Sequence, residues 1–469
     1  MKNYTLPEEV RSILDKFRSK KFQIYIVGGA VRDLLMGKEV TDWDFTTDAK
    51  PQEILKVFPD GFYDNKFGTV GIPIRQHLPG VGKQSPRTHL EGEQTGIMEI
   101  TTMRKEGDYK DHRHPSEVSW TNKIEEDLAR RDFTINAIVA TVIPAEAGIQ
   151  LIDPFHGQDD ISKKVIKAVG DPEKRFKEDA LRLMRAIRIA AQLGFEIDEK
   201  TFKAVQANAG LIKEIAWERI RDELFKILGS GNAYEGIVKL RDAGLLQIIL
   251  PEVEKCFGIV QEGPKHDRVY DIGEHSLLAL KLTPSDDPLV KFAALLHDVG
   301  KPNTFKTGSD KNVTFYNHDV WGGKIVLDIA KRFNLSKKQT DKLYNLVRWH
   351  MFSVNENQTD SAIRRFIKNV GLENIEDMMA VRVGDRLGGG TQTETSWRLE
   401  KFKKRIKQVL KKPFSISDLK INGNDVMKAL DIKPDPKVGE ILEKLFQEVL
   451  EDSSKNKKEF LLERIKQID

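Results

Sequence analysis

The spacing of apolar residues changes about one third of the way along the chain. Before that point, short strand-type runs alternate with amphipathic stretches such as Pro7–Lys20, where Val10, Ile13, Leu14 and Phe17 recur at helical intervals. After it, apolar residues recur almost entirely at helical spacing, with Pro and Gly as breaks. The pattern predicts an α+β protein, with a mixed-sheet head followed by an all-α remainder.

Within the head, three runs predict strands and two further stretches predict helices. Strands are predicted at Phe22–Val27, at Phe62–Ile74 with a turn at Gly68, and at Ile97–Met103, and helices at Pro51–Phe58 and Ile124–Ala140. Two stretches show neither the helical nor the strand-type spacing of apolar residues. Arg75–Thr95 is rich in Gly, Pro, Gln and Arg and predicts an exposed insert, and Ile143–Gln150 predicts a hairpin insertion between two strands.

The segment from Tyr25 to Phe45 combines several features of nucleotide chemistry. Gly28 and Gly29 follow the first apolar run, and paired glycines let a backbone approach a phosphate closely. Asp42 and Asp44 stand two residues apart, so in a strand both carboxylates point to one face, roughly 7 Å apart. That spacing suits two oxygen ligands sharing a pair of hard divalent cations.

Composition narrows the class of protein. The chain has 469 residues, 32% of them charged, and a net charge of only +4, so a nucleic-acid surface would require local clustering of basic residues. Cys256 is the single cysteine, which excludes an internal disulfide and suits a reducing cytosol. No apolar run approaches the roughly 20 residues of a membrane span, and no signal peptide is evident. We expect a cytoplasmic protein.

The head resembles the nucleotidyltransferase superfamily, specifically tRNA nucleotidyltransferases (CCA-adding enzymes) and bacterial poly(A) polymerases. The resemblance rests on YIVGGAVRDLLMGKEVTDWDF at residues 25–45. It implies that Asp42 and Asp44 hold two Mg²⁺ ions, while Gly28, Gly29 and Arg32 cradle the phosphates of the nucleotide.

Three further head segments extend this resemblance. Glu99, in MEITTMR, stands where the superfamily supplies a third carboxylate, although a solvated strand-edge residue is the alternative. RKEGDYKDHRHPSEV, from Arg104 to Val118, resembles the flexible loop that helps these enzymes switch from C to A addition. DLARRDFTINA resembles a helix that contacts ribose and triphosphate. This resemblance implies that Arg131 binds a phosphate and that Asp132 or Asn136 binds the sugar hydroxyls. The alternative is that Arg-Arg-Asp forms a surface ion pair.

The segment EDALR supplies the residues that would choose the base. Asp179 and Arg182 are three positions apart, which predicts neighbours on one helix face and, by itself, an ordinary salt bridge. The resemblance implies that this pair is a protein template for the incoming base. A carboxylate accepts and a guanidinium donates, which matches the hydrogen-bonding edges of cytosine and adenine but opposes those of uracil and guanine. We expect Arg185 to reach the phosphates or orient this pair, and Arg188 to support it.

The helical remainder carries a second possible site. Its histidines and aspartates follow the order H, HD, H, H, D and are His275, His297, Asp298, His318, His350 and Asp385. This order resembles the HD superfamily of metal-dependent phosphohydrolases. Imidazole and carboxylate donors suit Mg, Mn, Ni or Fe, and the resemblance implies hydrolysis of phosphate esters, as in repair of RNA 3′ ends, unless the module is vestigial. Lys301 would contact a phosphate.

A basic segment and tail complete the chain. RLEKFKKRIKQVLKK, from Arg398 to Lys412, has eight Lys or Arg residues against one Glu, which suits RNA-backbone contact as well as a solvated helix face. We predict a head at 1–155, a neck at 156–260, an HD domain at 261–395 and a tail at 396–469. The expected function is addition of CCA to the tRNA acceptor end from CTP and ATP. The alternatives are an A-adding enzyme, a poly(A) polymerase, and a phosphohydrolase with a degenerate head.

Overall fold

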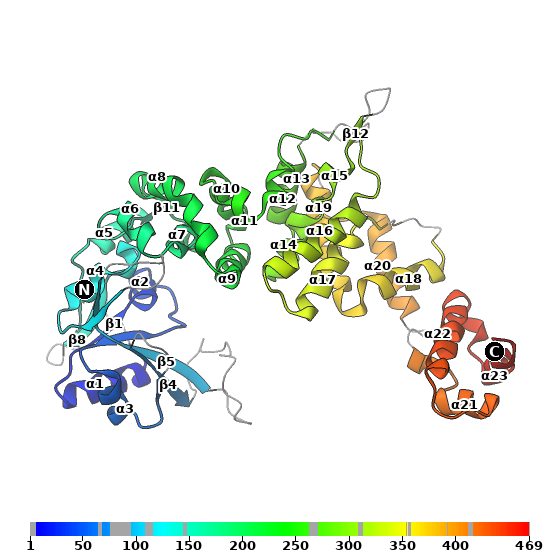
Figure 1. Cartoon of the computed structure of the whole chain (residues 1–469), viewed down its shortest axis with the longest axis horizontal. Helices are drawn as coiled ribbons and strands as arrows, with labels where there is room; N and C mark the ends of the chain where they lie inside the picture. The colour runs from blue at the N-terminus through cyan, green and yellow to red at the C-terminus, as the bar shows by residue number, and fades with distance from the viewer. Residues whose placement is uncertain are drawn as a thin grey trace. The chain divides into compact units, whose positions relative to one another are not determined.

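The computed structural model describes residues 6–63, 68–75, 95–107, 116–143, 148–261, 271–307, 313–352, 354, 358–391, 393–410 and 416–468. The chain forms two compact units, Met1–Leu250 and Pro251–Asp469 (Figure 1). The first contains the sheet and the second is mainly helical. None of the helices in the described ranges combines the length and the apolarity that crossing a bilayer requires.

The sheet has seven strands in the order β3-β4-β5-β2-β1-β8-β9. Their bounds are β1 Ile24–Val27, β2 Asp44–Thr47, β3 Phe62–Tyr63, β4 Thr69–Arg75, β5 Thr95–Thr102, β8 Val139–Ile143 and β9 Gly148–Ile152. Strands β2 and β5 run parallel, and the other neighbours run antiparallel. The predicted mixed sheet is therefore confirmed, including the antiparallel strands on either side of residues 144–147.

Helices α1 (Glu8–Ser19), α2 (Gly29–Leu35) and α3 (Pro51–Val57) contribute to one core with the sheet (Figure 1). All four apolar residues that predicted α1 are buried: Val10, Ile13, Leu14 and Phe17. Trp43 and Phe45 enter the same core. Because side chains alternate along an extended chain, this orientation turns Asp42 and Asp44 to the other side.

The predicted helix at Ile124–Ala140 is wrong after its first turns. Helix α4 covers Ile124–Ala129, and the 3₁₀ turn η1 (Thr134–Asn136) leads into β8. Between them Phe133 is extended and forms a β-bridge with Ala168, while Thr134 donates its N–H to the Lys167 carbonyl. Pairing with a distant segment overrides the local helical pattern here.

The rest of the first unit is helical, as predicted from Ser162 onward. Its elements are α5 Gly157–Lys163, β10 Val165–Ile166, α6 Pro172–Glu178, α7 Leu181–Leu193, β11 Glu196–Ile197, α8 Glu199–Asn208, α9 Trp217–Leu228, α10 Ala233–Asp242 and α11 Leu246–Ile249. Two short strands, β6 (Arg104–Glu106) and β7 (Val118–Trp120), pair across the segment that the sequence assigns to a flexible loop. Most of that loop, and most of the insert at 75–95, lies outside the described residues.

Helices of the second unit bury apolar residues in more than one cluster. Its elements are α12 Pro251–Glu254, α13 Ile272–Leu282, α14 Pro288–Leu296, α15 Lys301–Thr304, β12 Lys306–Thr307, β13 Val313–Thr314, α16 His318–Arg332, α17 Lys337–Arg348, α18 Asp360–Val370, α19 Ile375–Gly388, α20 Trp397–Val409, α21 Gly423–Leu430, α22 Pro436–Glu451 and α23 Lys458–Ile468. Residues of α18 and α20 share one apolar cluster, and α21, α22 and α23 form another.

Candidate functional site

The carboxylates predicted in the head come together at the start of β2. Strand β2 begins at Asp44, so Asp42 lies just before the strand and not within it as expected. Asp44 stands in register with Glu99 on the parallel strand β5. Burial raises the pKa of Asp44 to about 7, and the charges of Asp42 and Glu99 add to the increase. Three like charges in one place are the electrostatic signature of a cation site.

The turn before α2 brings the backbone of Gly28 close to Asp44 and Arg131. Gly28 has φ +72°, which favours glycine, and a Cβ there would lie 3.5 Å from Arg131 Nη1 and 3.7 Å from Asp44 Oδ2. The Arg131 charge lowers the pKa of Asp44 and so partly opposes the other carboxylates. Gly28, Asp44 and Arg131 therefore lie close together, a combination of backbone, carboxylate and guanidinium that suits a phosphate and its counterions.

Other residues that are predicted to bind the nucleotide are linked to one another by hydrogen bonds. Arg32 donates to both oxygens of Asp33 (2.9 and 3.0 Å) and to Asn136 Oδ1 (3.0 Å). Asn136 donates to Asp132 Oδ1 (3.3 Å), and Arg185 donates twice to Asp132 Oδ2 (2.5 and 2.8 Å). Burial alone would raise the pKa of Asp132, but the charge and hydrogen bonds of Arg185 outweigh it and lower the pKa. This chain of hydrogen bonds links the head to α7.

Asp179 and Arg182 do not share a helix face, which corrects the prediction. Helix α6 ends at Glu178, Asp179 is extended (φ −135°, ψ 106°), and α7 begins at Leu181. The Asp179 carboxylate accepts the Leu181 N–H (3.1 Å), the local hydrogen bond by which Asp competes with a continuous helix. Its other oxygen faces Arg219 Nη2 at 3.4 Å. The two template residues therefore flank a break between helices.

Arg182 is 9% exposed and firmly held. Its Nη1 donates to the Arg175 carbonyl (3.1 Å) and to Glu178 Oε2 (2.7 Å), and its Nη2 donates to the Arg130 carbonyl (2.9 Å). A guanidinium has five N–H donors. Within the described part of the chain, these contacts use three, so two donors remain for a ligand.

Several residues of this region were not predicted as site residues. They are Asp127, Arg130, Arg175, Glu178 and Arg219. Asp127 and Arg130 belong to DLARRDFTINA and Glu178 belongs to EDALR, so these three residues lie within motifs that the sequence displays. Arg188, by contrast, was predicted as support and forms an ion pair with Glu223 (2.7 Å).

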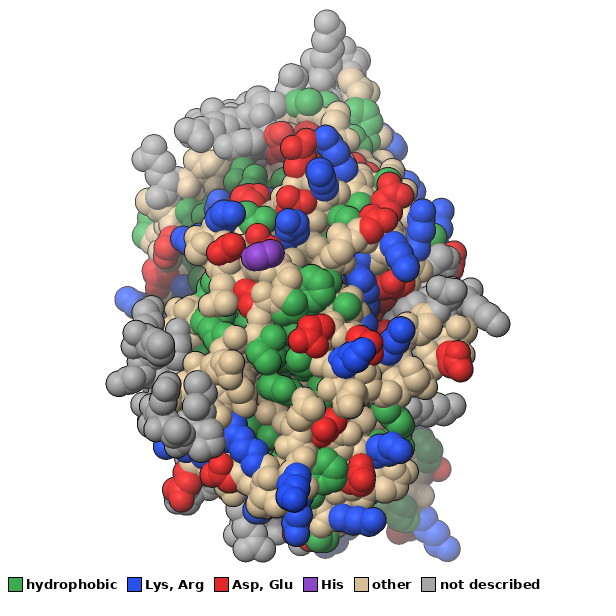
Figure 2. Space-filling model, turned by 90° about the vertical axis from the view of Figure 1, so that its left-hand side faces the viewer, with side chains coloured by type: hydrophobic (Ala, Val, Ile, Leu, Met, Phe, Trp, Pro, Cys, Tyr) green, Lys and Arg blue, Asp and Glu red, His purple; other side chains and the backbone are tan. Residues whose placement is uncertain are grey.

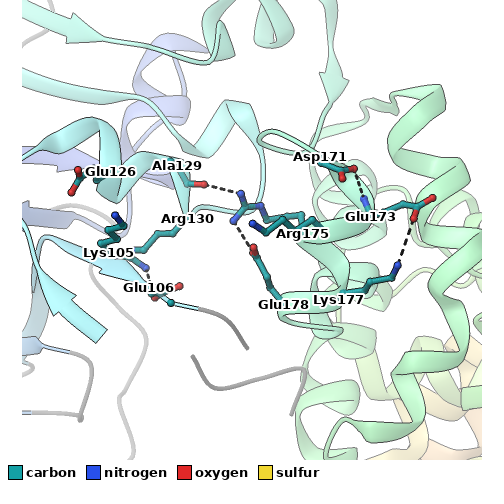
Figure 3. Close-up of a pocket in the computed structure, with 12 residues that line it drawn as sticks. Lys105, Glu106, Glu126, Ala129, Arg130, Asp171, Glu173, Arg175, Lys177 and Glu178 are labelled. Carbon is teal, nitrogen blue, oxygen red and sulfur yellow. Dashed lines mark hydrogen bonds and ion pairs between the residues drawn. The ribbon is translucent and has the colours of Figure 1, made fainter. Parts of the chain in front are cut away.

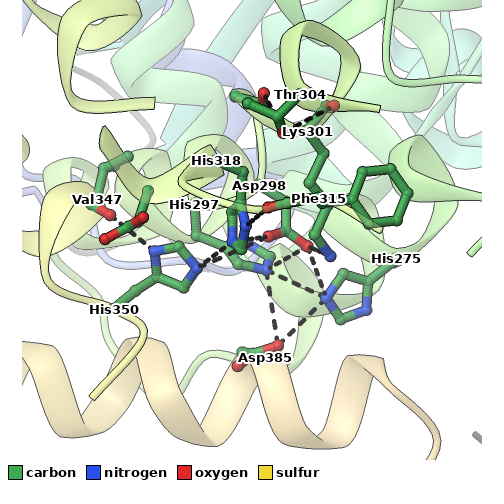
Figure 4. Close-up of polar contacts among 12 residues, drawn as sticks. His275, His297, Asp298, Lys301, Thr304, Phe315, His318, Val347, His350 and Asp385 are labelled. Atoms are coloured by element: carbon green, nitrogen blue, oxygen red, sulfur yellow. Dashed lines mark hydrogen bonds and ion pairs between the residues drawn. The ribbon is translucent and has the colours of Figure 1, made fainter. Parts of the chain in front are cut away.

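In the second unit, the six predicted histidines and aspartates converge on one buried place (Figure 4). They come from α13, α16 and α19 and from the residues that follow α14 and α17, and they form two groups of potential ligands: His275, His297 and Asp385, and Asp298, His318 and His350. The two pairs of facing imidazoles have Nε2 atoms 3.1 Å (His275 and His297) and 3.3 Å (His318 and His350) apart.

Asp298 lies between the two groups. Its Oδ2 is 3.2 Å from His297 Nε2, and its Oδ1 is 3.4 Å from His318 Nε2 and 3.7 Å from His350 Nε2. Lys301 Nζ also contacts Oδ2, at 2.6 Å. One carboxylate thus offers an oxygen to each group, an arrangement that the sequence alone did not predict.

Backbone carbonyls orient three of these imidazoles. The Nδ1 atoms of His297, His318 and His350 lie 2.7, 2.8 and 2.7 Å from the carbonyl oxygens of residues 294, 315 and 347. Each Nδ1 must carry a proton to donate, which in the neutral ring leaves a lone pair on Nε2, inside the cluster. Burial is the main cause that lowers the pKa of His350 to about 4. The donor set therefore fits divalent metal ions.

Glycines bring the ligand-bearing helices close enough to build this cluster. A Cβ on Gly300 would lie 2.0 Å from the His318 carbonyl oxygen, so only glycine fits where α15 meets α16. Gly384 and Gly388 would similarly meet α13 at 2.1 and 2.8 Å. These close approaches bring Asp385 Oδ1 to 3.2 Å from His275 Nε2.

Comparison with known proteins supports the class of the head and of the whole chain. Residues 24–167 match the model of the Poly A polymerase head domain, residues 194–257 that of an RNA and SrmB-binding site of polymerase A, and residues 326–465 that of tRNA nucleotidyltransferase domain 2. The head is thus of the nucleotidyltransferase class.

Two curated relatives match over nearly their full lengths. One is the A-adding tRNA nucleotidyltransferase of Deinococcus radiodurans, 31% identical over 90% of each chain. The other is the CCA-adding enzyme of Ligilactobacillus salivarius, 30% identical over 99% of this chain and 98% of the relative. The chain spans about half the length of the Geobacillus CCA-adding enzymes it also matches.

A solved structure agrees with these matches. The CCA-adding enzyme of Bacillus stearothermophilus in complex with CTP aligns with a TM-score of 0.67, 25% identity and 99% of each chain covered. The chain belongs to the tRNA nucleotidyltransferase family of class II CCA-adding enzymes.

Proposed function

We propose that this chain adds C, C and A to the 3′ end of tRNA, taking the nucleotides from CTP and ATP. The observation that carries the proposal is the grouping of Asp42, Asp44 and Glu99 beside Gly28 and Arg131. Family membership and the CTP complex of the aligned structure support the same reaction.

In the reaction, the 3′ hydroxyl of the RNA attacks the α-phosphorus of the nucleotide, and the bond to the β-phosphate breaks to release pyrophosphate. Bound Mg²⁺ would supply activation of the hydroxyl and neutralisation of the triphosphate. Asp42 and Asp44 would hold it, with Glu99 completing the carboxylate set. Arg131 would orient a phosphate through its guanidinium, and the missing side chain at Gly28 leaves the phosphate room.

Base choice would fall to Asp179 and Arg182. Two guanidinium N–H donors of Arg182 and the acceptor oxygens of Asp179 complement the edge that cytosine and adenine share. Uracil and guanine would set donor against donor, leaving polar groups unpaired in a buried site. Asp132 lies within the hydrogen-bond chain from Arg32 to Arg185. We therefore propose that its role is to orient these two arginines rather than to bind the sugar hydroxyls.

The second unit would contact the body of the tRNA. Arg398, Lys401, Lys404 and Lys407 lie exposed along one face of α20, and the helix buries Leu399, Phe402, Ile406 and Val409 on the other. A row of cations suits the phosphate backbone. On the face drawn in Figure 2, basic and acidic side chains of the described residues are interleaved, so local rows such as this one matter more than net charge.

The test supplies tRNA that lacks its 3′ CCA with each nucleotide alone, then with CTP and ATP together, and sequences the product ends. We expect two additions with CTP alone and three with both. Failure to use CTP would favour the A-adding alternative that the Deinococcus relative represents, and long ATP-only tails would favour a poly(A) polymerase. Incorporation of UTP would refute the roles of Asp179 and Arg182.

We also propose that the histidine and aspartate cluster would hold a divalent metal, which would supply activated water for the hydrolysis of phosphate monoesters or cyclic diesters. The observation that favours this proposal is the pair of three-residue groups of potential ligands around the buried carboxylate of Asp298. Lys301, whose Nζ lies 2.6 Å from Asp298 Oδ2, would contact the substrate phosphate. Metal content per chain and phosphatase activity should both fall in Asp298→Ala, and a metal-free parent protein would overturn this assignment.

A further inference from the structure

Two arginines of the helices that follow the sheet bind the end of the short helix α4. Arg175 Nη2 donates to the Ala129 carbonyl (2.9 Å), as Figure 3 shows, and Arg182 Nη2 donates to the Arg130 carbonyl (2.9 Å). The last carbonyls of a helix lack partners within it and carry partial negative charge, so a guanidinium suits them. The position of Arg182 therefore depends on where the end of α4 lies.

One fully buried carboxylate, Asp127, determines where that end lies. Its Oδ1 accepts from Arg130 Nε (3.0 Å), Arg130 Nη2 (2.8 Å) and the Arg104 backbone N–H (3.2 Å). Its Oδ2 accepts from Arg131 Nη2 (3.3 Å) and Thr46 Oγ1 (3.4 Å). Burial alone would raise the pKa of Asp127, but Arg130 and Arg131 outweigh burial and lower it, so this carboxylate stays ionised.

These contacts connect Asp127 to residues that lie beside Asp44, Gly28 and Arg182. Thr46 lies on β2, two residues after Asp44, and Arg131 lies beside Gly28. Arg130 holds Arg182 through its carbonyl, and Arg104 begins β6, at the start of the segment 104–118. A shift of about 1 Å in such a framework costs on the order of 100-fold in rate.

We propose that Asp127 is a positioning residue that fixes the phosphate-binding Arg131 and the base-reading Arg182 relative to the catalytic Asp44. The inference rests on the proposed nucleotide addition. Asn at this position would keep the size but lose the charge, and its amide would present N–H donors to arginine donors. One of the two guanidinium groups would then face an N–H donor in place of a carboxylate oxygen and move.

The experiment compares Asp127→Asn with the parent enzyme, in full-length protein, on tRNA lacking its 3′ CCA. Single-nucleotide addition is measured with CTP and with UTP. We expect kcat/KM for CTP to fall about 100-fold. The preference for CTP over UTP should fall at least about tenfold, because the guanidinium of Arg182 is no longer aligned to hydrogen-bond the edge of the base. A purely structural role would lower both activities together and leave the preference unchanged, which would overturn the inference.

A matched control is Asp160→Asn. Asp160 is also a buried carboxylate of the first unit, and it accepts from Thr134 Oγ1 (2.6 Å) without touching an arginine of the site. We expect it to leave the preference for CTP unchanged. If Asp127→Asn fails to fold by circular dichroism, Arg130→Lys takes its place, since it keeps the cation but removes the two-point contact to Asp127.

The outcomes separate this inference from the function on which it rests. A parent enzyme that adds no C to the tRNA refutes the proposed function. A parent that adds C, together with an Asp127→Asn variant of unchanged nucleotide preference, refutes only the positioning role.

Discussion

The raised pKa of Asp44 makes the stability of the metal-free head depend on pH. In the folded protein burial and the charges of Asp42 and Glu99 raise this pKa from 3.8 to about 7. Because the native state then binds the proton more tightly than the unfolded chain, stability is highest below pH 4 and falls as pH rises toward the folded pKa. At about 1.4 kcal/mol per pKa unit, the full loss approaches about 4 kcal/mol.

Between pH 5 and pH 8 this loss amounts to about 3 kcal/mol. Asp44→Asn carries no titrating group at this position, so the variant should gain about 3 kcal/mol in free energy of unfolding relative to the parent over that interval. Denaturant unfolding of both proteins in the presence of a chelator measures the difference. Contributions from the histidine cluster cancel, because they are the same in both proteins.

Adding Mg²⁺ at pH 8 should return the lost stability to the parent but not to Asp44→Asn. At 100 times the dissociation constant the recovery is about 2.7 kcal/mol. Asp60→Asn, an exposed carboxylate of the same unit, is the control and should track the parent at every pH. A difference between Asp44→Asn and the parent that stays constant from pH 5 to pH 8 would refute the electrostatic reasoning.

Three further predictions concern packing and hydrogen bonding. Gly28→Ala places a methyl 3.5 Å from Arg131 Nη1 on a backbone with φ +72°, so kcat/KM for CTP should fall at least about tenfold. Circular dichroism should show that the variant still folds. Full activity of the variant would show that no phosphate binds beside Gly28. Gly300→Ala drives a methyl to 2.0 Å from the His318 carbonyl oxygen and should abolish metal binding in elemental analysis, whereas Gly439→Ala, which meets nothing within 4 Å, should retain it. Arg364, 1% exposed, donates to the Val449 and Leu450 carbonyls near the end of α22, so Arg364→Met should destabilise the second unit by about 1–3 kcal/mol in thermal unfolding. Lys368→Met, on the same helix but exposed, should cost less than about 1 kcal/mol, and an equal cost for both variants would contradict the importance of these hydrogen bonds.

Sequence patterns predicted the structure correctly where the burial of one face determines how an element packs. The apolar spacing of α1 predicted all four of its buried residues, because a helix packed on a sheet buries one stripe. The order of histidines and aspartates likewise predicted that these six side chains meet in one cluster, and whether the cluster binds a metal stays a prediction.

Patterns failed where a distant segment competes for the backbone. Ile124–Ala140 was predicted as one helix, yet Phe133 pairs with Ala168 and the chain turns into a strand. Asp179 was also predicted within a helix, but there the competing contact is local: its side chain accepts the N–H of Leu181, two residues on, and a new helix starts. Short polar side chains can bond the nearby backbone in this way, and the spacing of apolar residues does not reveal which of them do.

The sequence by itself determined which chemical groups this protein has: three carboxylates and a Gly-Gly turn in the head, the pair of Asp179 and Arg182, and six histidines and aspartates farther on. Only the tertiary structure decided how they are held. Asp127, on α4, contacts β2, β6 and the two arginines that follow α4, and the two oxygens of Asp298 face different histidines. Such roles depend on segments that meet only in the folded chain, because a buried carboxylate takes its function from the donors that surround it.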